Sequence, residues 1–423
     1  SRARGMVWSG ISSSGVEGSG EKGDDDEPEF PLLQWLAKNG VYIAPGNGFH
    51  RQLIGGVEKH GASRLLATFE KLKRAGANRV LSPYKLGGIQ MAATALRPAR
   101  LWPTLAAPTL GDGGRAPNQL ELLSDPQGVA RLSEAPVILV AVARNEKILM
   151  PHFLAHYRGL GVRHFVLVDN LSDDGTREYL LTQPDVVLYS ADTDYRDSHY
   201  GVAWQQAVLG AHALGRWVVL ADIDEMLVYE DYERQPITQW LADLQAQGHD
   251  AALTLMVDMY PSGELANADF TQAANLFEMA PNFDRQPLQR WQLGAGHYSN
   301  AVTYLSALRH RLIPDSAPNL YTSQKVAVFR YAPWVRLAQG LHYVSNLKVA
   351  PQPAFFAHFK YHAGFREKVL QEIARKQHFN GAEEYAKYLA MLAESEGQLA
   401  RDGVSVRYEG SHSFRELGDL LKS

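Results

Sequence analysis

From about residue 135 onward, short apolar runs alternate with segments in which apolar residues recur at helical spacing. The apolar runs are Val137–Val142, His164–Val168, Asp185–Tyr189, Trp217–Ala221 and Ala251–Val257. The helical patterns between them are Ile148–Leu160, Thr176–Leu181, Val202–Leu214 and Ile237–Gln247. Near-continuous apolar strands that alternate with helices indicate βαβ units and a largely parallel sheet buried on both faces. We therefore predict an α/β fold of Rossmann-like type, with ligands bound beyond the carboxyl ends of the strands.

The chain divides into four segments by composition. Residues 1–30 are rich in Gly, Ser and acidic side chains, and we predict a disordered leader or a tag there. Residues 31–130 form an N-terminal region of unknown role, which includes an amphipathic helix predicted over 61–76. The α/β domain is predicted over 131–350. A mostly helical extension is predicted over 351–423, with two amphipathic helices on either side of residues 380–381.

Charge and cysteine content exclude several classes of function. The chain has 42 basic and 46 acidic residues, which argues against a globally basic nucleic-acid binder. Residues 51–100 nevertheless hold ten Lys and Arg against two Glu; this segment is either a solvated basic face or a contact for anionic lipid headgroups or another polyanion. The longest apolar stretch, Ala135–Ala143, is far shorter than the roughly 20 residues of a membrane helix. We expect a cytoplasmic protein, with peripheral contact to the inner membrane through residues 51–100 as the alternative.

Polar clusters follow three of the predicted strands. They are Arg144-Asn145-Glu146, the run from Asp169 to Thr176, and Asp222-Ile223-Asp224-Glu225. The part of the second cluster from Asp173 to Thr176 is also explained as a turn with a helix cap. Because strand alternation places Asp222 and Asp224 on one side, we expect the two carboxylates to converge.

Two converging carboxylates repel each other unless a cation or a proton lies between them. A hard divalent ion with oxygen ligands, Mg²⁺ or Mn²⁺, meets that need. The chain has no cysteine, so carboxylates and imidazoles are its only strong metal ligands. The sequence therefore predicts a divalent metal site at Asp222 and Asp224.

These motifs resemble those of the family 2 glycosyltransferases, which have a GT-A fold. Ala143-Arg144-Asn145-Glu146 resembles the first-strand motif of that family, and Asp169 to Thr176 resembles its second acidic run, with Asn170 and Leu171 as departures. Asp222-Ile223-Asp224-Glu225 resembles the family's D-x-D. Residues 137–411 are more narrowly similar to a bacterial subgroup with a D-I-D-E core, on further motifs that include Lys325-Val326-Ala327-Val328-Phe329-Arg330, Gly340-Leu341-His342-Tyr343 and Val406-Arg407-Tyr408-Glu409-Gly410-Ser411.

The resemblance implies transfer of a sugar, with inversion, from a nucleotide-sugar donor such as a UDP-sugar to a glycan or lipid-linked acceptor. It implies Asp224 as a direct ligand of Mn²⁺ or Mg²⁺ and His342 as a further one. The nucleotide-binding residues that it implies are Ala143, Asn145, Asp169, which would accept from the base, Asp222 near the ribose or acting through water, and Lys325 at the diphosphate. Lys325 is equally explained as a solvated loop lysine, and Glu225 as either a support of the site or a surface acid.

Inversion needs a carboxylate that takes the proton of the acceptor hydroxyl. Asp258 is our first candidate, because it ends a predicted strand that we place beside the one that carries the D-x-D. Glu264, Asp269 and Asp284 follow as weaker candidates. His358 and His362 are four residues apart, which aligns them on one face if they lie on a helix, but the preceding Phe-rich run is equally consistent with a strand.

Two other functions remain open. One is a binding module on the same fold without turnover, which the intact Asp222 and Asp224 argue against. The other is a phosphatase of the haloacid-dehalogenase type, which wants Thr or Val where this chain has Met226. A dinucleotide-binding fold is disfavoured, because no G-x-G-x-x-G follows the first strand. The sugar, the acceptor, the linkage and the oligomeric state are not encoded in any motif that we can identify.

Overall fold

The computed structural model describes residues 100–101, 120–195, 198, 200–213, 215–285, 289–292, 302–314, 316, 318–331, 337, 342, 347–375, 383–395 and 397–420. The leader predicted over 1–30, the helix predicted over 61–76 and almost all of the basic segment over 51–100 lie outside these residues.

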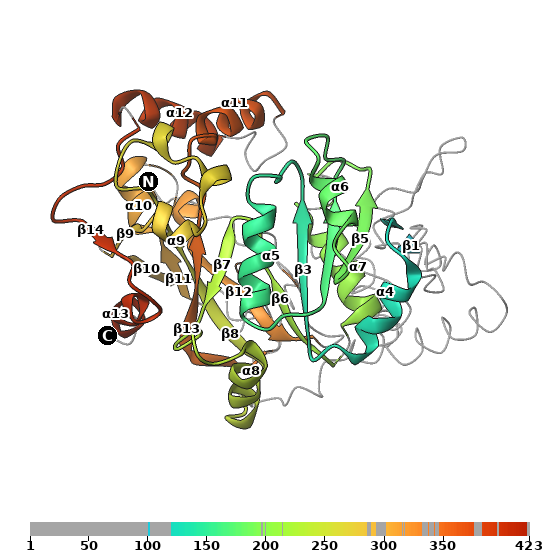
Figure 1. Cartoon of the computed structure of the whole chain (residues 1–423). Helices are drawn as coiled ribbons and strands as arrows, with labels where there is room; N and C mark the ends of the chain where they lie inside the picture. The colour runs from blue at the N-terminus through green and yellow to red at the C-terminus, as the bar shows by residue number, and fades with distance from the viewer. Residues whose placement is uncertain are drawn as a thin grey trace, which may run out of the picture.

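A ten-stranded mixed sheet forms the centre of the described chain (Figure 1). In sheet order its strands are β1 (Arg100–Leu101), β2 (Leu120–Leu122), β5 (Val186–Ala191), β4 (Phe165–Asp169), β3 (Val137–Ala143), β6 (Trp217–Leu220), β12 (Gln324–Arg330), β8 (Ala251–Asp258), β13 (Val349–His358) and β7 (Glu225–Val228). β2, β7 and β12 run against the direction that the other strands share. The predicted α/β fold with a mixed, mostly parallel sheet is therefore confirmed.

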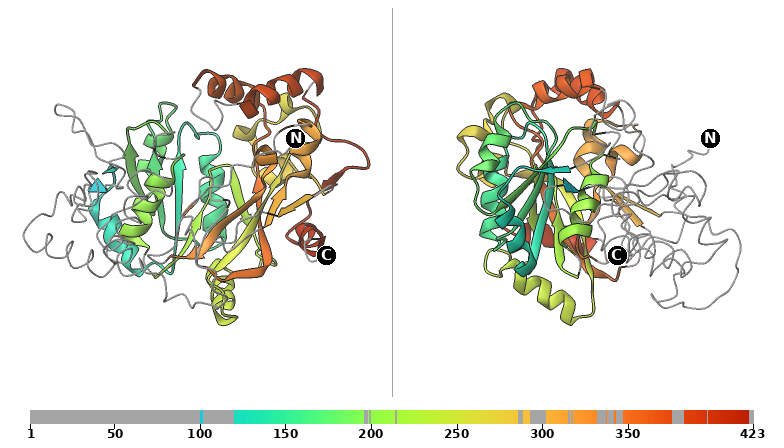
Figure 2. Two further views of the ribbon diagram at one scale, coloured as in Figure 1. Left: turned by 180° about the vertical axis from the view of Figure 1, so that it is seen from behind. Right: turned by 90° about the vertical axis from the view of Figure 1, so that its right-hand side faces the viewer.

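The order of the central strands creates a switch point between β3 and β6. Helices α5 (Met150–Gly159) and α6 (Thr176–Leu181) connect β3 to β4 and β4 to β5, so the chain steps along the sheet in one direction. Helix α7 (Val202–His212) then returns the chain past β3 to β6. Because such crossovers are right-handed, α7 lies on the face of the sheet opposite to α5 and α6. Figure 2 shows the helices on both sides of the sheet. Ligands of such sheets bind at the carboxyl ends of the strands beside this point.

The second half of the sheet is assembled from strands that are far apart in the chain. β13 pairs in parallel with β8 and in antiparallel with β7, which brings His358 opposite both Asp258 and Glu225. The Phe-rich run before His358 is thus a strand, and the alternative of a helix with His358 and His362 on one face is wrong. A strand is favoured because it is buried between two neighbours that supply its hydrogen bonds. The domain boundary predicted at residues 350–351 falls inside β13.

Further helices lie beside the sheet and beyond both of its ends (Figure 1). The two amphipathic helices predicted around residues 380–381 are confirmed as α11 (Phe365–Arg375) and α12 (Glu383–Ser395). The other helices are α4 (Pro126–Arg131), α8 (Ile237–Ala246), α9 (Leu276–Met279), α10 (Ala307–Leu312) and α13 (His412–Leu420), with 3-10 turns η3 (Leu132–Glu134), η4 (Leu265–Asn267), η5 (Phe270–Gln272) and η6 (Pro318–Tyr321). Two small antiparallel sheets pair β9 (Asn282–Asp284) with β14 (Ser405–Arg407) and β10 (Gln289–Gln292) with β11 (Val302–Leu305). Within the described ranges, we find no helix whose length and hydropathy would let it cross a membrane.

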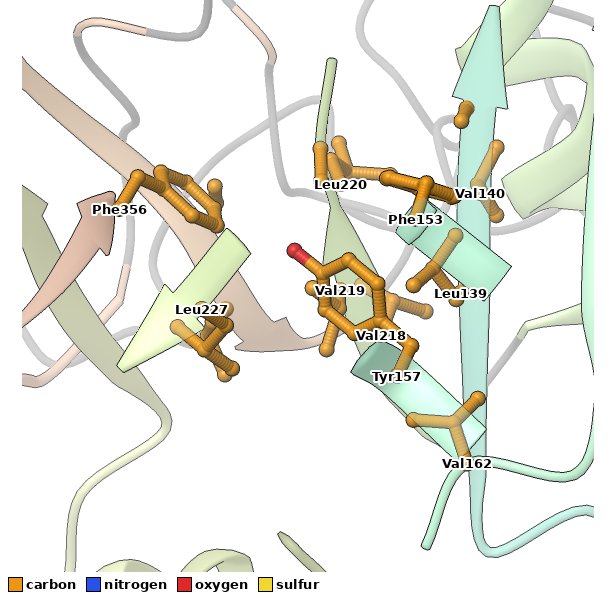
Figure 3. Packing of buried hydrophobic residues seen from close by; sticks show 14 of the residues in the cluster. Leu139, Val140, Phe153, Tyr157, Val162, Val218, Val219, Leu220, Leu227 and Phe356 are labelled. Atoms are coloured by element: carbon orange, nitrogen blue, oxygen red, sulfur yellow. The ribbon is translucent and has the colours of Figure 1, made fainter. Parts of the chain in front are cut away.

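The core beneath the switch point is packed from β3, β6, α5 and β7 (Figure 3). Leu139, Phe153 and Leu227 are fully buried there with their neighbours. The Tyr157 hydroxyl, also buried, donates a hydrogen bond to the backbone oxygen of Glu225 at 2.9 Å. The apolar core therefore fixes the backbone at the start of β7, directly beside the acidic motif.

Candidate active site

Asp222 and Asp224 lie in the turn that joins β6 to β7, at the switch point of the sheet. The turn is closed in both directions: the backbone N–H of Glu225 donates to the Asp222 carbonyl, and that of Asp222 donates to Glu225 Oε2, each at 3.0 Å. Buried Ile223 anchors the turn in the core. The prediction that strand alternation aligns the two aspartates is wrong, because β6 has ended at Leu220. Their side chains are 51% and 18% exposed, so both carboxylates are accessible.

Lys325, on β12, neutralises two carboxylates of this turn. Its Nζ lies 2.6 Å from Asp222 Oδ2 and 2.6 Å from Glu225 Oε1, and its side chain is only 5% exposed. Burial alone would lower the pKa of Lys325, but the two carboxylates raise it above its ordinary value and keep the ammonium charged. Both Lys325 and Glu225 are buried, so Lys325 is not a solvated loop lysine and Glu225 is not a surface acid.

His358 links Asp224 to Asp258. Its Nε2 lies 3.1 Å from Asp224 Oδ2, and its Nδ1 lies 2.6 Å from Asp258 Oδ1. Burial alone would lower the pKa of His358, but the two carboxylates raise it to about 9, so the ring is an imidazolium at neutral pH. Burial would likewise raise the pKa of Asp224, yet the His358 charge holds it well below its usual range. Asp224 is therefore a fixed anion oriented through one of its oxygens.

Asp258, the first candidate for the base, is fully occupied by hydrogen bonds. Its Oδ2 accepts from Ser306 Oγ at 2.5 Å and from Arg309 Nε at 3.0 Å, and Oδ1 faces His358. Burial opposes ionisation, but Arg309, His358 and Ser306 together hold the pKa of Asp258 well below its usual range. A buried carboxylate with this environment is poorly suited to take a proton from an acceptor. Sequence reasoning missed Ser306 and Arg309, which no motif marks, and the contact of His358 with Asp224.

Glu146 and Lys368 close the site from the β3 side. Glu146 follows β3, and Lys368 on α11 reaches it with Nζ 2.8 Å from Oε1. Burial raises the pKa of Glu146 to about 6; Lys368 opposes the shift, while the charges of Asp224 and Asp222 add to it. Glu146 thus differs from Asp258, because its pKa lies close to neutral pH.

The residues that the resemblance assigns to the nucleotide lie beside the same edge. Ala143 ends β3 in register with Asp169 at the end of β4. Asn145 has a left-handed backbone, with φ of 55°, and its side chain both donates to and accepts from Asp173. Asp169 is buried and accepts from Arg177 Nε at 2.8 Å and Nη2 at 2.5 Å. Asp169 therefore stabilises this loop, and a base edge would have to compete with Arg177 for it.

His342 lies against β12 rather than at an exposed strand end. Its Nδ1 is 2.7 Å from the backbone oxygen of Gln324. Burial lowers the pKa of His342 to about 4, so the ring is neutral, as a metal ligand must be. The structure gives no contact between His342 and Asp224 among the residues that it describes, and the role of His342 as a ligand stays a prediction.

Of the weaker candidates for the base, Asp269 and Asp284 have structural roles. Glu264 and Asp269 are exposed, and Asp269 caps η5 by accepting from the backbone N–H and hydroxyl of Thr271. Asp284 is buried and accepts from Arg311 Nε at 2.7 Å and from the Tyr260 hydroxyl.

The carboxylates of Asp222 and Asp224 fit one kind of metal site. In the described part of the chain, each keeps one oxygen that accepts no hydrogen bond. No three His, Asp or Glu side chains among the described residues are grouped to hold an ion. Mg²⁺ is typically held by one or two carboxylates and completed by substrate phosphate oxygens and water. The donor set therefore fits a divalent ion shared with a bound phosphate, and it does not fit a cage made by the protein alone.

No protein-family model and no curated protein matches the chain. Among solved structures, a putative glucose-1-phosphate thymidylyltransferase from Bacillus anthracis in complex with sucrose aligns at 9% identity, covering 68% of this chain and 95% of that one with a TM-score of 0.23. A UDP-glucose pyrophosphorylase complexed with UDP-glucose aligns at 7% identity, covering 68% and 98%, with a TM-score of 0.21. Likenesses this distant carry no functional inference.

Proposed function

We propose that this protein transfers a sugar from a nucleotide-sugar donor, a UDP-sugar in the first instance, to a hydroxyl of a glycan or lipid-linked acceptor. The observation that carries the proposal is the pair of Asp222 and Asp224 at the switch point. Each carboxylate is held by a protein cation through one oxygen, and among the described residues its other oxygen accepts no hydrogen bond. This arrangement suits a phosphate-bound divalent ion at the place where α/β sheets bind nucleotides.

Breaking the glycosidic bond leaves negative charge on the diphosphate of the donor. Asp222 and Asp224 would hold Mg²⁺ or Mn²⁺, and the ion would supply Lewis-acid stabilisation of that charge. Lys325 and His358 orient the two carboxylates and prevent them from repelling each other. In this proposal the protein prearranges the anionic half of the site, and the donor brings the remaining oxygen ligands.

We assign Asp258 to the positioning of His358 rather than to proton transfer, because both of its oxygens are engaged. Glu146 is the better-suited base for the acceptor hydroxyl, since its pKa of about 6 lets it be ionised at neutral pH and still accept a proton. An E146Q variant should lose turnover while retaining donor binding. A D258N variant that retained its stability and donor binding but lost turnover, with E146Q still active, would reverse this assignment.

The two alternatives predict different behaviour. A phosphatase of the dehalogenase type would hydrolyse simple phosphate esters without any nucleotide sugar. A binding module without turnover would bind the nucleotide and release no product.

The decisive experiment is a screen of UDP-, GDP- and dTDP-sugars for nucleotide release with Mn²⁺, with Mg²⁺ and with a chelator. We expect one donor class to be consumed only when a divalent ion is present, and D224N to abolish that release. D231N is a matched control, because Asp231 is exposed and lies just after β7. Release that persists in D224N or in chelator, or hydrolysis of simple phosphate esters, would contradict the proposal.

A further inference from the structure

A cavity of about 460 Å³ lies beside the site, between the loop at residues 265–266, the start of α11 and the helix α12. Its wall is mainly apolar, with side chains that include Leu265, Ala266, Leu389, Leu392 and Ala393. Two polar side chains, His362 and Arg366, also line it. The cavity is therefore an apolar pocket with two hydrogen-bond donors in its wall.

His362 presents one defined donor. The residue is buried, and its ring stacks on Phe270 with ring centroids 4.9 Å apart. The backbone N–H of Gly364 donates to Nδ1 at 3.1 Å, so in the neutral ring the proton is on Nε2. Within the described residues Nε2 has no hydrogen-bond partner, which leaves an Nε2–H for a bound molecule.

Arg366 is the one charged side chain in the described wall of the cavity. It is exposed, and it makes no ion pair or hydrogen bond with the described residues. Its neighbours on α11 are occupied elsewhere: Glu367 accepts from Gln371, and Lys368 pairs with Glu146. The guanidinium is therefore available to an anionic group at the mouth of the cavity.

The cavity is coupled in space to the carboxylates of the active site. His358 contacts Asp224, and His362 follows it by four residues, which limits the distance between the two Cα atoms to about 14 Å. Helix α11 carries both Arg366 and Lys368, and Lys368 reaches Glu146 at 2.8 Å. A molecule seated in the cavity can thus extend toward the reacting carbon of a donor held at Asp224.

We propose that this cavity is the acceptor subsite and that it selects an amphiphilic acceptor with an apolar body and one anionic group. The apolar body fills the pocket between the two helices, the anion pairs with Arg366, and an oxygen accepts from Nε2 of His362. The assignment of this cavity to the acceptor rests on the proposed transferase function, whereas the binding preference rests on the residues of the cavity alone.

Calorimetric titration of the full chain with octyl β-D-glucuronide, octyl β-D-glucoside and glucuronate, below their micellar concentrations, tests this subsite. We expect octyl glucuronide to bind at least about tenfold more tightly than either other probe, because a charge-assisted hydrogen bond and the apolar chain each add affinity. Arg366→Gln should remove the preference for the glucuronide without weakening the glucoside. Ala393→Phe, which fills the cavity from its rim, should weaken both octyl glycosides.

Two variants serve as controls: Leu370→Ala alters an apolar α11 residue that is 41% exposed and outside the wall, and Arg407→Gln alters an exposed arginine on β14. Both should bind the probes as the wild type does. Equal binding of the two octyl glycosides, no binding of either, or an unchanged glucuronide affinity in Arg366→Gln would overturn the proposal. If donor is consumed but the pocket variants bind the probes as the wild type does, the proposed subsite is wrong and the proposed transferase function stands. If probe binding depends on Arg366 but no donor is consumed, the binding site stands and the transferase function is wrong.

Discussion

Two stretches of the chain, which we call the first half and the second half, contribute opposite charges to one site. The first half, residues 135–228, supplies the acidic groups Glu146, Asp222, Asp224 and Glu225 from the ends of β3 and β6 and the start of β7. The second half, residues 251–375, supplies Lys325, His358 and Lys368, which contact those acids. The strands of the first half are near-continuous apolar runs, whereas β12 and β13 of the second half also carry Lys325 and His358, which are buried beside those acids. The active site is therefore an electrostatic boundary between the two stretches.

The cations Lys325 and His358 of the second half are buried. Within the described residues, their ion-pair partners are acids of the first half and Asp258. Removing one partner of a buried pair leaves an uncompensated charge, which is far more costly than losing an exposed pair. Substitutions in the two regions should accordingly separate stability from function.

The largest contrast is expected between D258N and D224N, which remove the two carboxylates that hold His358. D258N leaves buried Arg309 without its carboxylate, and we expect it to lower the free energy of unfolding by about 3 to 5 kcal/mol. D224N affects an accessible side chain and should cost about 1 kcal/mol while abolishing donor turnover. Urea unfolding and nucleotide release measured on both proteins check this. Equal losses of unfolding free energy in the two variants would show that Asp258 contributes no more to stability than Asp224 does.

A double-mutant cycle on Lys325 and Glu225 tests whether the cation of the second half serves the acids of the first. K325M should lower the free energy of unfolding by about 3 kcal/mol, because it leaves buried Glu225 unpaired. The double variant K325M/E225Q should recover a large part of that loss, since neither charge remains. Additive effects of the two single substitutions would contradict the pairing.

Acid should weaken the second half through His362. Burial lowers the pKa of His362 to about 4, below the ordinary value of 6.5, so the unfolded chain binds the extra proton first. The stability from this ring is complete above pH 6.5 and is lost as the pH falls toward 4, on the order of 3 kcal/mol in total. His362→Gln should flatten the dependence of unfolding free energy on pH over that interval, and His412→Gln, an exposed control on α13, should leave it unchanged. Parallel curves for wild type and His362→Gln would disprove this effect.

The smallest effect is expected from an ion pair within the first half. Arg158 and Asp185 approach to 2.6 Å, but their side chains are 32% and 21% exposed. D185N should lower the unfolding free energy by less than about 1 kcal/mol, and added salt should reduce the difference further. A loss of unfolding free energy as large as that expected for K325M would contradict the expectation that this exposed ion pair contributes less than the buried pair of Lys325 and Glu225.

The first half could be predicted from the sequence because its information is local. Strands β3, β4, β5 and β6 and the helices between them follow from apolar runs and helical periodicity, and their ends place Asp222 and Asp224 at one edge. The detail of the Asp222–Asp224 turn could not be predicted, because a hydrogen bond from the backbone of Asp222 to the side chain of Glu225 determines it.

The second half depends on pairings between distant segments. Lys325 is more than a hundred residues from Asp222, and no local pattern shows that β12 lies beside β6. His358 could have been found by the rule that functional groups follow strands, once the Phe-rich run was assigned to β13. Arg309 and Ser306 carry no such signal, because a short helix after a small hairpin places them against Asp258.

Calorimetric titration of UDP into the wild-type protein and D224N, each with Mn²⁺ and with a chelator, tests whether the two aspartates form a metal-dependent nucleotide site. We expect UDP to bind to the wild type, chelation to weaken binding by more than about tenfold, and D224N to remove this metal dependence. UDP binding that is equal in all four titrations, or absent from all of them, would contradict the claim that Asp222 and Asp224 form a site for a metal-bound nucleotide diphosphate.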